Sequence, residues 1–280
     1  MTDDCSATLR SRMPDAVSLL AISIVAAVGS MVNSIAGGGT LLTFPALVAI
    51  GIPPIVANAT STVALWPGAL SSMLGYRTRL SGTGRWAAWF ALPSLLGGGA
   101  GALLLLNTPA DRFSAIVPWL VLGATLLFAA QGPIMQWLRG SPGDAPAHVI
   151  AGPPGALHIP HLSAATLAAQ FCVGVYGGYF GAGIGILMLA VLGFMGFTDI
   201  HQMNGLKNWG GLCINFIAAA LFAFSGIVDW MVAVAMAVGA TAGGYFASVA
   251  AQRVPPTMVR RAVIVIGVLS GVWLYWARFE

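Results

Sequence analysis

Long apolar runs alternate with short polar stretches along the whole chain. Many of these runs approach or exceed the ~20 residues that an α-helix needs to cross a bilayer. The alternating segments of ~10 residues that build a transmembrane β-barrel are absent. The pattern therefore predicts an all-α protein, a polytopic transmembrane helical bundle. About eight full spans are expected, at residues 16–36, 55–76, 86–106, 113–138, 162–181, 203–225, 229–250 and 258–278.

Two shorter apolar segments interrupt this series, and each follows a glycine-rich break. The first break, Gly37–Gly39, precedes the segment Thr40–Ile52, whose ~13 residues would make a helix of ~20 Å, too short for a comfortable crossing. The second break, Gly181–Gly183, precedes Ile184–Met195 in the same way. Two interrupted apolar segments at matching places in two halves of a chain point to a transport site.

The chain divides into two related halves. We expect a polar N-terminal tail at residues 1–15, a first transmembrane repeat at 16–138, a linker rich in proline and glycine at 139–161, and a second transmembrane repeat at 162–280.

The arginines set the expected orientation of these repeats. They gather at residues 77–85 and 253–261, whereas the loops at 107–112 and 226–229 carry no net positive charge. Arginine-rich loops stay on the cytoplasmic side of a membrane. Both clusters can be cytoplasmic only if each short segment returns the chain to the side from which its preceding span started. The second repeat is then inverted relative to the first, and both termini are expected outside.

Composition supports the membrane assignment and narrows the chemistry. With 58% hydrophobic and 7% charged residues and a mean hydropathy of +0.87, the chain is not a soluble globular protein. Its net charge of +4 gives no reason to expect nucleic-acid binding, because arginines bordering spans are an ordinary orientation signal. The three cysteines and the linker histidines lack metal-ligand spacing, so no metal site is predicted. No histidine or carboxylate lies deep in a span, so no catalytic residues are predicted and an enzyme is not expected.

Lys207 is the most informative single residue. It is the only lysine in the chain and the only charge placed well inside a span. A lysine at the centre of a membrane helix costs ~2.5–3.5 kcal/mol on insertion scales, so it needs a partner or an aqueous cavity. One interpretation is an anion site. The alternative is a lysine that extends its ammonium group to the membrane surface, because Lys207 lies only a few residues into its span.

Polar residues and glycines around the two breaks are the other candidates. Asn58 and its neighbouring hydroxyls correspond in the repeat to Asn204 and Lys207, although such hydroxyls often bond only their own helix backbone. Asn215 continues the same helix face or bridges helices. A helix that starts after a glycine break directs unpaired N–H groups inward, which suits an anion. The predicted substrate-binding residues are Asn33, Ser34, Gly37, Gly38, Gly39, Thr40, Asn58, Thr60, Ser61, Tyr176, Tyr179, Gly181, Gly183, Asn204, Lys207 and Asn208.

At these twin stretches the sequence resembles the TauE/SafE family of sulfite-exporter-like membrane transporters. The likeness rests on Gly29–Pro45 with its GGGT core, on Pro53-Pro54 followed by Ala59-Thr60-Ser61, and on Gly177–Gly185 and Lys207-Asn208. It extends over nearly all of both halves. The resemblance implies export or uptake of small sulfur-containing anions such as sulfite, sulfoacetate or related sulfonates, and no enzymatic cofactor. Gly205-Leu206 stand where the family's second copy often has Thr-Ser, so hydroxyl ligands from that half are not expected.

The sequence therefore predicts a secondary transporter of a small sulfur-containing anion, working by alternating access in the cell membrane, the cytoplasmic membrane of a bacterium. Its expected partners are the anion and the lipid bilayer, with the coupling proton or ion, the direction and the oligomeric state left open. The alternatives are an anion channel or a transporter of a non-sulfur organic anion. A membrane-embedded enzyme fits less well, because it would need a nucleophile–base pair or a metal cluster inside the spans. An assembly subunit without a substrate would leave the paired polar breaks unexplained.

Overall fold

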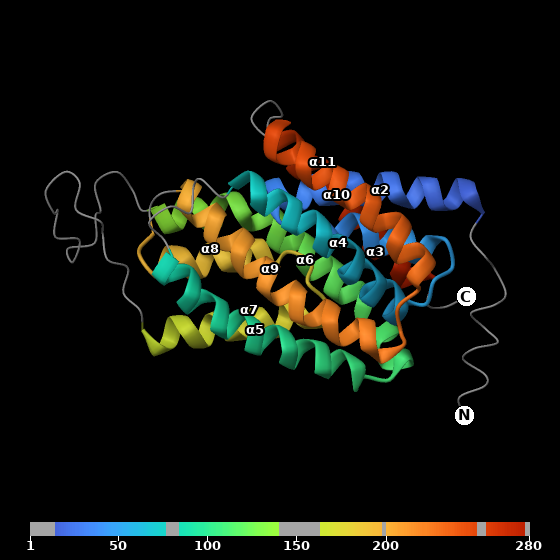
Figure 1. The fold of residues 1–280 in the computed structure, drawn as a ribbon, viewed down its shortest axis with the longest axis horizontal. Helices are drawn as coiled ribbons and strands as arrows, with labels where there is room; N and C mark the ends of the chain where they lie inside the picture. The colour runs from blue at the N-terminus through green and yellow to red at the C-terminus, as the bar shows by residue number, and fades with distance from the viewer. Residues whose placement is uncertain (1–14, 77–83, 140–162, 198–199, 251–255, 278–280) are drawn as a thin grey trace, which may run out of the picture.

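The computed structural model describes residues 15–76, 84–139, 163–197, 200–250 and 256–277, and the described residues fold into helices without a strand (Figure 1). The all-α fold class is thus confirmed. The predicted tail and linker fall outside the described residues, except for Asp15 and Arg139. The described helices are α2 (Ala16–Ala36), α3 (Thr40–Ala49), α4 (Pro54–Tyr76), α5 (Gly84–Leu106), α6 (Ala110–Arg139), α7 (Ala164–Tyr179), α8 (Ile184–Phe194), α9 (Ile200–Ser225), α10 (Trp230–Ala250) and α11 (Pro256–Trp276).

Five of these helices are long and apolar enough to cross a membrane, namely α2, α5, α6, α9 and α10. The predicted count of about eight full spans is therefore not confirmed. α7 has only 16 residues, α4 carries a polar first half, and α11 holds two arginines near its start. The two short segments are confirmed as short apolar helices, α3 and α8.

Glycines in the left-handed backbone region delimit both short helices. Gly37 ends α2 with a φ of 81°, and Gly183 precedes α8 with a φ of 78°. Just beyond the far ends of α3 and α8, Gly51 and Gly196 have φ values of 91° and 92°. Residues with a Cβ rarely adopt this conformation, so glycine is required at each of these turns.

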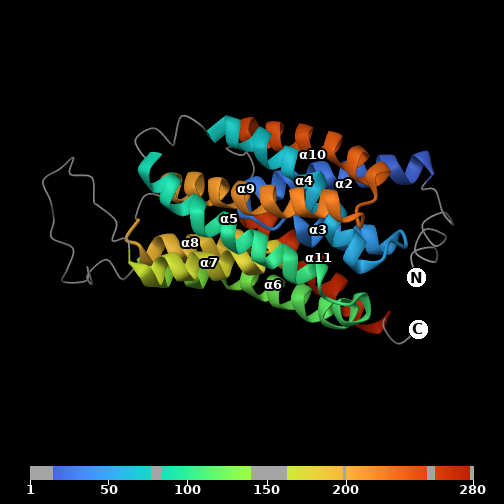
Figure 2. The ribbon, with the colours of Figure 1, turned by 60° about the horizontal axis from the view of Figure 1, so that its bottom comes forward.

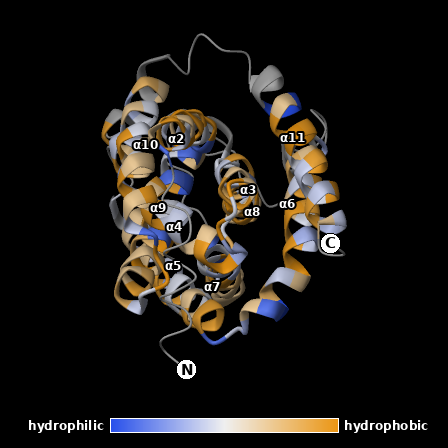
Figure 3. Cartoon of the chain, turned by 90° about the vertical axis from the view of Figure 1, so that its right-hand side faces the viewer, coloured by the Kyte–Doolittle hydropathy of each residue, from blue (hydrophilic) through white to orange (hydrophobic). Residues whose placement is uncertain are grey.

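The helices of the two halves pack in corresponding ways. α2 packs on α10 and α10 on α4, whereas α7 packs on α5 and α5 on α9. α4 and α9 meet each other, as do α6 and α11. Seen from one end, α3 and α8 lie between the α6–α11 pair and the remaining helices (Figure 3). Each half therefore supplies helices that pack on the other half.

The two corresponding interfaces depend on glycine. A Cβ built on Gly243 of α10 would lie 2.1 Å from the carbonyl oxygen of Ala27 on α2. A Cβ built on Gly101 of α5 would lie 2.0 Å from the carbonyl oxygen of Val175 on α7. Small residues permit such close contact between helices, and in a membrane close contact replaces the missing hydrophobic effect.

Corresponding helices run in opposite directions through the molecule. α2 begins at the right-hand end in Figures 1 and 2, and α7 begins at the left-hand end. In the same views α4 runs from right to left and α9 from left to right. In both views α11 ends at the right-hand end, so the start of α2 and the end of α11 lie at one end of the molecule.

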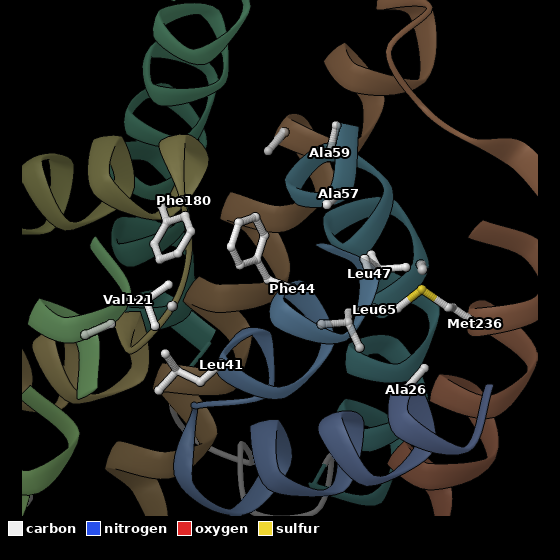
Figure 4. Packing of buried hydrophobic residues seen from close by; sticks show 14 of the residues in the cluster. Ala26, Leu41, Phe44, Leu47, Ala57, Ala59, Leu65, Val121, Phe180 and Met236 are labelled. Atoms are coloured by element: carbon white, nitrogen blue, oxygen red, sulfur yellow. The ribbon is translucent and has the colours of Figure 1, made fainter. Parts of the chain in front are cut away.

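Aromatic packing fills the centre beside α3. Phe44 of α3 and Phe180, which follows α7, face each other with ring centroids 5.4 Å apart in an edge-to-face arrangement (Figure 4). Both are almost completely buried. Leu41 and Val121 lie beside them. This apolar block holds α3 and the end of α7 together next to the polar region described below.

Candidate functional site

A cavity lies where the end of α2, the start of α8 and parts of α4 and α9 meet. Its volume is about 40 Å³, and on this measure roughly 10–15 Å³ is enough for one water molecule. The cavity therefore has room for a group larger than water.

The α9 wall supplies two hydrogen-bond donors that have no partner. Lys207 lines the cavity, is 3% exposed, and its Nζ atom makes no hydrogen bond. Asn208 also lines the cavity, and its Nδ2 atom is buried without a partner. Both groups only donate. No carboxylate is among the described residues that line this space. An unpaired buried charge is costly, so the arrangement favours a bound anion.

Asn215 extends this wall. It lies two helical turns beyond Lys207 and also lines the cavity, which agrees with the interpretation that the polar face of this helix continues. Asn204, one turn before Asn208, is half-buried and does not line the cavity. The neighbouring Asp199 and the side chain of His201 lie outside the described part of the chain.

The opposite wall is built from hydroxyl and amide groups of α2 and α4. Asn33 and Ser34, two of the predicted substrate-binding residues, line it. The Oγ atoms of Ser34 and Ser72 are 2.5 Å apart and buried. One hydroxyl donates to the other, so one hydroxyl hydrogen is left for a ligand.

Two polar residues of this wall were not predicted, Ser30 and Ser72. Ser30 lies one turn before Ser34 on α2, so helical periodicity could have identified it. Ser72 has no such signal, because Ser71 beside it is equally polar but bonds the carbonyl oxygens of Gly68 and Thr241, at 2.9 and 3.0 Å.

The first glycine break touches the first turn of α8 beside the cavity. A Cβ built on Gly37 would lie 3.0 Å from the Cα atom of Gly185, and both glycines line the cavity. α8 begins at Ile184, which also lines it. The N–H groups in the first turn of a helix lack intrahelical partners and carry the positive end of its dipole. They add to the donors of α9.

The start of α3 is not part of this cavity. Gly38 packs against the ring of Phe128, where a Cβ would lie 2.7 Å from the ring, and a Cβ on Gly39 would lie 2.3 Å from the carbonyl oxygen of Gly29. Thr40 is half-buried outside the cavity. Of the two short helices that start after a glycine break, only α8 begins at the cavity.

The candidates on the first half of α4 bond to other helices. Asn58 is 1% exposed, and its Nδ2 atom donates to the carbonyl oxygen of Tyr179 at 3.0 Å. Thr60 accepts a hydrogen bond from the backbone N–H of Asp229 at 3.0 Å. The hydroxyls of Ser61 and Thr43 are 2.7 Å apart. None of the three candidates lines the cavity.

The candidates around the second break likewise make internal contacts. The hydroxyl of Tyr176 donates to the carbonyl oxygen of Ala182 at 2.8 Å, and that of Tyr179 lies 3.5 Å from Thr108 Oγ1. Gly181 and Gly183 both have positive φ values and form the turn between α7 and α8. Of the predicted residues, the structure brings together at the cavity Asn33, Ser34, Gly37, Lys207 and Asn208.

Comparisons match the chain to a family of membrane transporters. The family model described as sulfite exporter TauE/SafE matches residues 21–274. A probable membrane transporter protein, ORF9, of Sinorhizobium sp. is 29% identical over 92% of this chain and 93% of its own length. One of Haemophilus influenzae is 28% identical over 89% and 92%. YfcA of Escherichia coli K12, also a probable membrane transporter protein, is 29% identical over 90% and 87%. No solved structure matches.

Proposed function

The chain belongs to the sulfite exporter TauE/SafE family of membrane transporters, and from this we propose that it moves a small sulfur-containing anion, such as sulfite, sulfoacetate or a related sulfonate, across the membrane. It is a multi-pass cell-membrane protein with a transport role, since its relatives are named as membrane transporters. The substrate binds in the cavity between α2, α4, α8 and α9.

One observation carries this proposal, the buried ammonium group of Lys207 without a hydrogen-bond partner. A structural lysine in a membrane protein pairs with a carboxylate or extends to the surface. Lys207 does neither, since it is 3% exposed and lines a cavity without a carboxylate. Asn208 and the first turn of α8 add neutral donors around the same space. An oxyanion satisfies all of these groups at once.

The proposed mechanism is alternating access between two inverted repeats, 16–138 and 162–280. The corresponding packing of α2 on α10 and of α7 on α5 supports two copies of one module, and the opposite directions of α2 and α7 in Figures 1 and 2 support their inversion. Two inverted copies around one site give two related arrangements, each open to one side of the membrane.

Replacing Lys207 tests the binding site. We expect Lys207→Ala to abolish transport of ³⁵S-labelled sulfite into vesicles, because the charge that attracts the anion is lost. The protein should stay folded, since the change removes an unpaired buried charge. Arg261→Ala is the matched control, because it removes a cation that is exposed on α11 and does not line the cavity. Transport that survives in Lys207→Ala would refute the assignment.

A second measurement separates a carrier from an anion channel. Unlabelled sulfite trapped inside vesicles should accelerate uptake of the labelled anion, because a carrier returns loaded faster than empty. A channel gives no such counterflow.

A further inference from the structure

Gly211 is a glycine in the middle of α9 that lines the cavity. It lies one helical turn beyond Lys207 and one turn before Asn215, which line the same cavity. Apart from its two chain neighbours and its own helix backbone, a Cβ built on Gly211 would meet one atom within 4 Å, the Cε atom of Met188 at 3.9 Å. That is an ordinary contact, so a side chain at this position would enter the cavity without clashing with the fold.

The neighbouring Gly210 shows what a packing glycine looks like at this place. A Cβ on Gly210 would lie 2.6 Å from the Cε1 atom of Phe90 and 3.2 Å from the Sδ atom of Met188. Gly210 is therefore required by its neighbours. Gly211 has no such requirement, and glycine in a helix interior is destabilising relative to alanine. The one thing that its missing side chain provides is space beside Lys207 and Asn208.

We propose that Gly211 determines the size of the anion that this site accepts. The inference rests on the proposed function and refines it. Gly211 lies one helical turn, ~6 Å along the axis, beyond Lys207 and lines the same cavity, so a substituent directed along α9 from a charged group held by Lys207 and Asn208 passes over Gly211. The side chain of Asn215, one turn further on, offers a polar group to the far end of such a substituent. The substrate class that fits is a sulfonate with a small substituent.

The experiment compares anions of increasing size on purified full-length protein. Dissociation constants for sulfite, methanesulfonate and sulfoacetate are measured by calorimetry on the wild type, Gly211→Ala and Gly211→Val. We expect the ratio of the sulfoacetate to the sulfite constant to rise about tenfold in Gly211→Ala, which is the usual effect of one methyl group in a tight pocket. It should rise further in Gly211→Val, and methanesulfonate should fall between the other two anions.

Gly123→Ala is the matched control. Gly123 lies in α6, is exposed, and a Cβ there would meet nothing within 4 Å. The same substitution outside the cavity should leave the ratio unchanged. A ratio that stays the same in both Gly211 variants would overturn the assignment of Gly211 while leaving the proposed function intact. If the wild-type protein bound none of the three anions, the proposed function would fail, and this inference with it.

Discussion

At the scale of single residues, hydrogen bonding distinguishes the polar groups that are satisfied within the fold from those that lack a partner. Thr62 and Thr125 donate to carbonyl oxygens four residues earlier in their own helices, so their hydroxyls need nothing further. The Nζ atom of Lys207 and the Nδ2 atom of Asn208 have no hydrogen-bond partner within the protein. Most buried polar groups in proteins are hydrogen-bonded, so two unsatisfied donors at adjacent positions in one cavity indicate a ligand.

Asn208→Asp tests the sign of the charge that the cavity accepts. The change keeps the size of the side chain but replaces the donor with a carboxylate beside Lys207. We expect sulfite affinity to fall by at least tenfold, because one close charge interaction of ~1.4 kcal/mol changes a binding constant by that factor. Calorimetry on purified protein measures it.

The control for this variant is Asn107→Asp, the same change at an exposed residue outside the cavity. Sulfite binding that is unchanged or tighter in Asn208→Asp would mean that the anion does not bind beside residue 208.

Lys207 could be identified from the sequence because a lone charge in an apolar span needs a compensating environment, and Asn208 was named with it as part of the polar set on the same span. Both residues line the cavity. Asn58 was grouped with them through the alignment of the repeats. That alignment carries no information on which face of a helix meets which neighbour. In the structure the Nδ2 atom of Asn58 donates to the carbonyl oxygen of Tyr179, and Asn58 does not line the cavity.

At the scale of helices, α6 shows how a proline inside a long helix can be compensated from a neighbour. Pro133 lies within α6 and has no N–H group. The carbonyl oxygen of Ala129, four residues earlier, therefore lacks its usual intrahelical donor. The guanidinium group of Arg260 on α11 donates to this oxygen instead. The contact joins the end of α6 to the start of α11.

A double-mutant cycle tests this compensation. We expect Arg260→Ala to destabilise the protein by about 1–2 kcal/mol, because it leaves a carbonyl without a donor. In a Pro133→Ala background the same change should cost less, because residue 133 then supplies the N–H itself. Thermal unfolding of the four proteins in detergent gives the coupling. Equal costs in both backgrounds would mean that the bond contributes little.

The starts of the short helices were predicted well, because each follows a glycine break. They begin at Thr40 and Ile184, as predicted, and end at Ala49 and Phe194, before the predicted ends at residues 52 and 195. The number of spans was harder to predict. Polar residues that contact other helices inside the bundle lower the hydropathy of a helix such as α4, which is therefore not among the five helices apolar enough to cross a membrane. Length and hydropathy describe a helix surrounded by lipid, whereas the first half of α4 contacts other helices.

At the scale of the whole molecule, the packing joins the two halves into one body. α5 of the first half contacts α7 and α9, and α10 of the second contacts α2 and α4. Sequence analysis predicted two halves from their repeated motifs. The contacts between helices of different halves could not be predicted, because they are made by the backbone at glycines. A glycine looks the same in a sequence whether it faces lipid or another helix.

Orientation in the membrane is a prediction at this scale. Arg260 and Arg261 lie near the start of α11, so this end of the molecule is expected in the cytoplasm. α11 ends at the opposite end, the end of the molecule at which α2 starts (Figures 1 and 2). A C-terminal alkaline phosphatase fusion should therefore be active and a C-terminal green fluorescent protein dark. The reverse pattern would place the arginines outside.

The contact between Gly37 and Gly185 limits how small a working version of this polypeptide can be. One face of the cavity, with Ser34 and Ser72, comes from the first five helices, and the face with Lys207 comes from the last five. A half-length chain would leave its polar groups facing hydrocarbon with nothing across from them. It could act only beside a companion inserted the other way up. In the proposed inverted arrangement, carrying both halves on a single polypeptide ensures that the two directions of insertion are always produced in equal numbers.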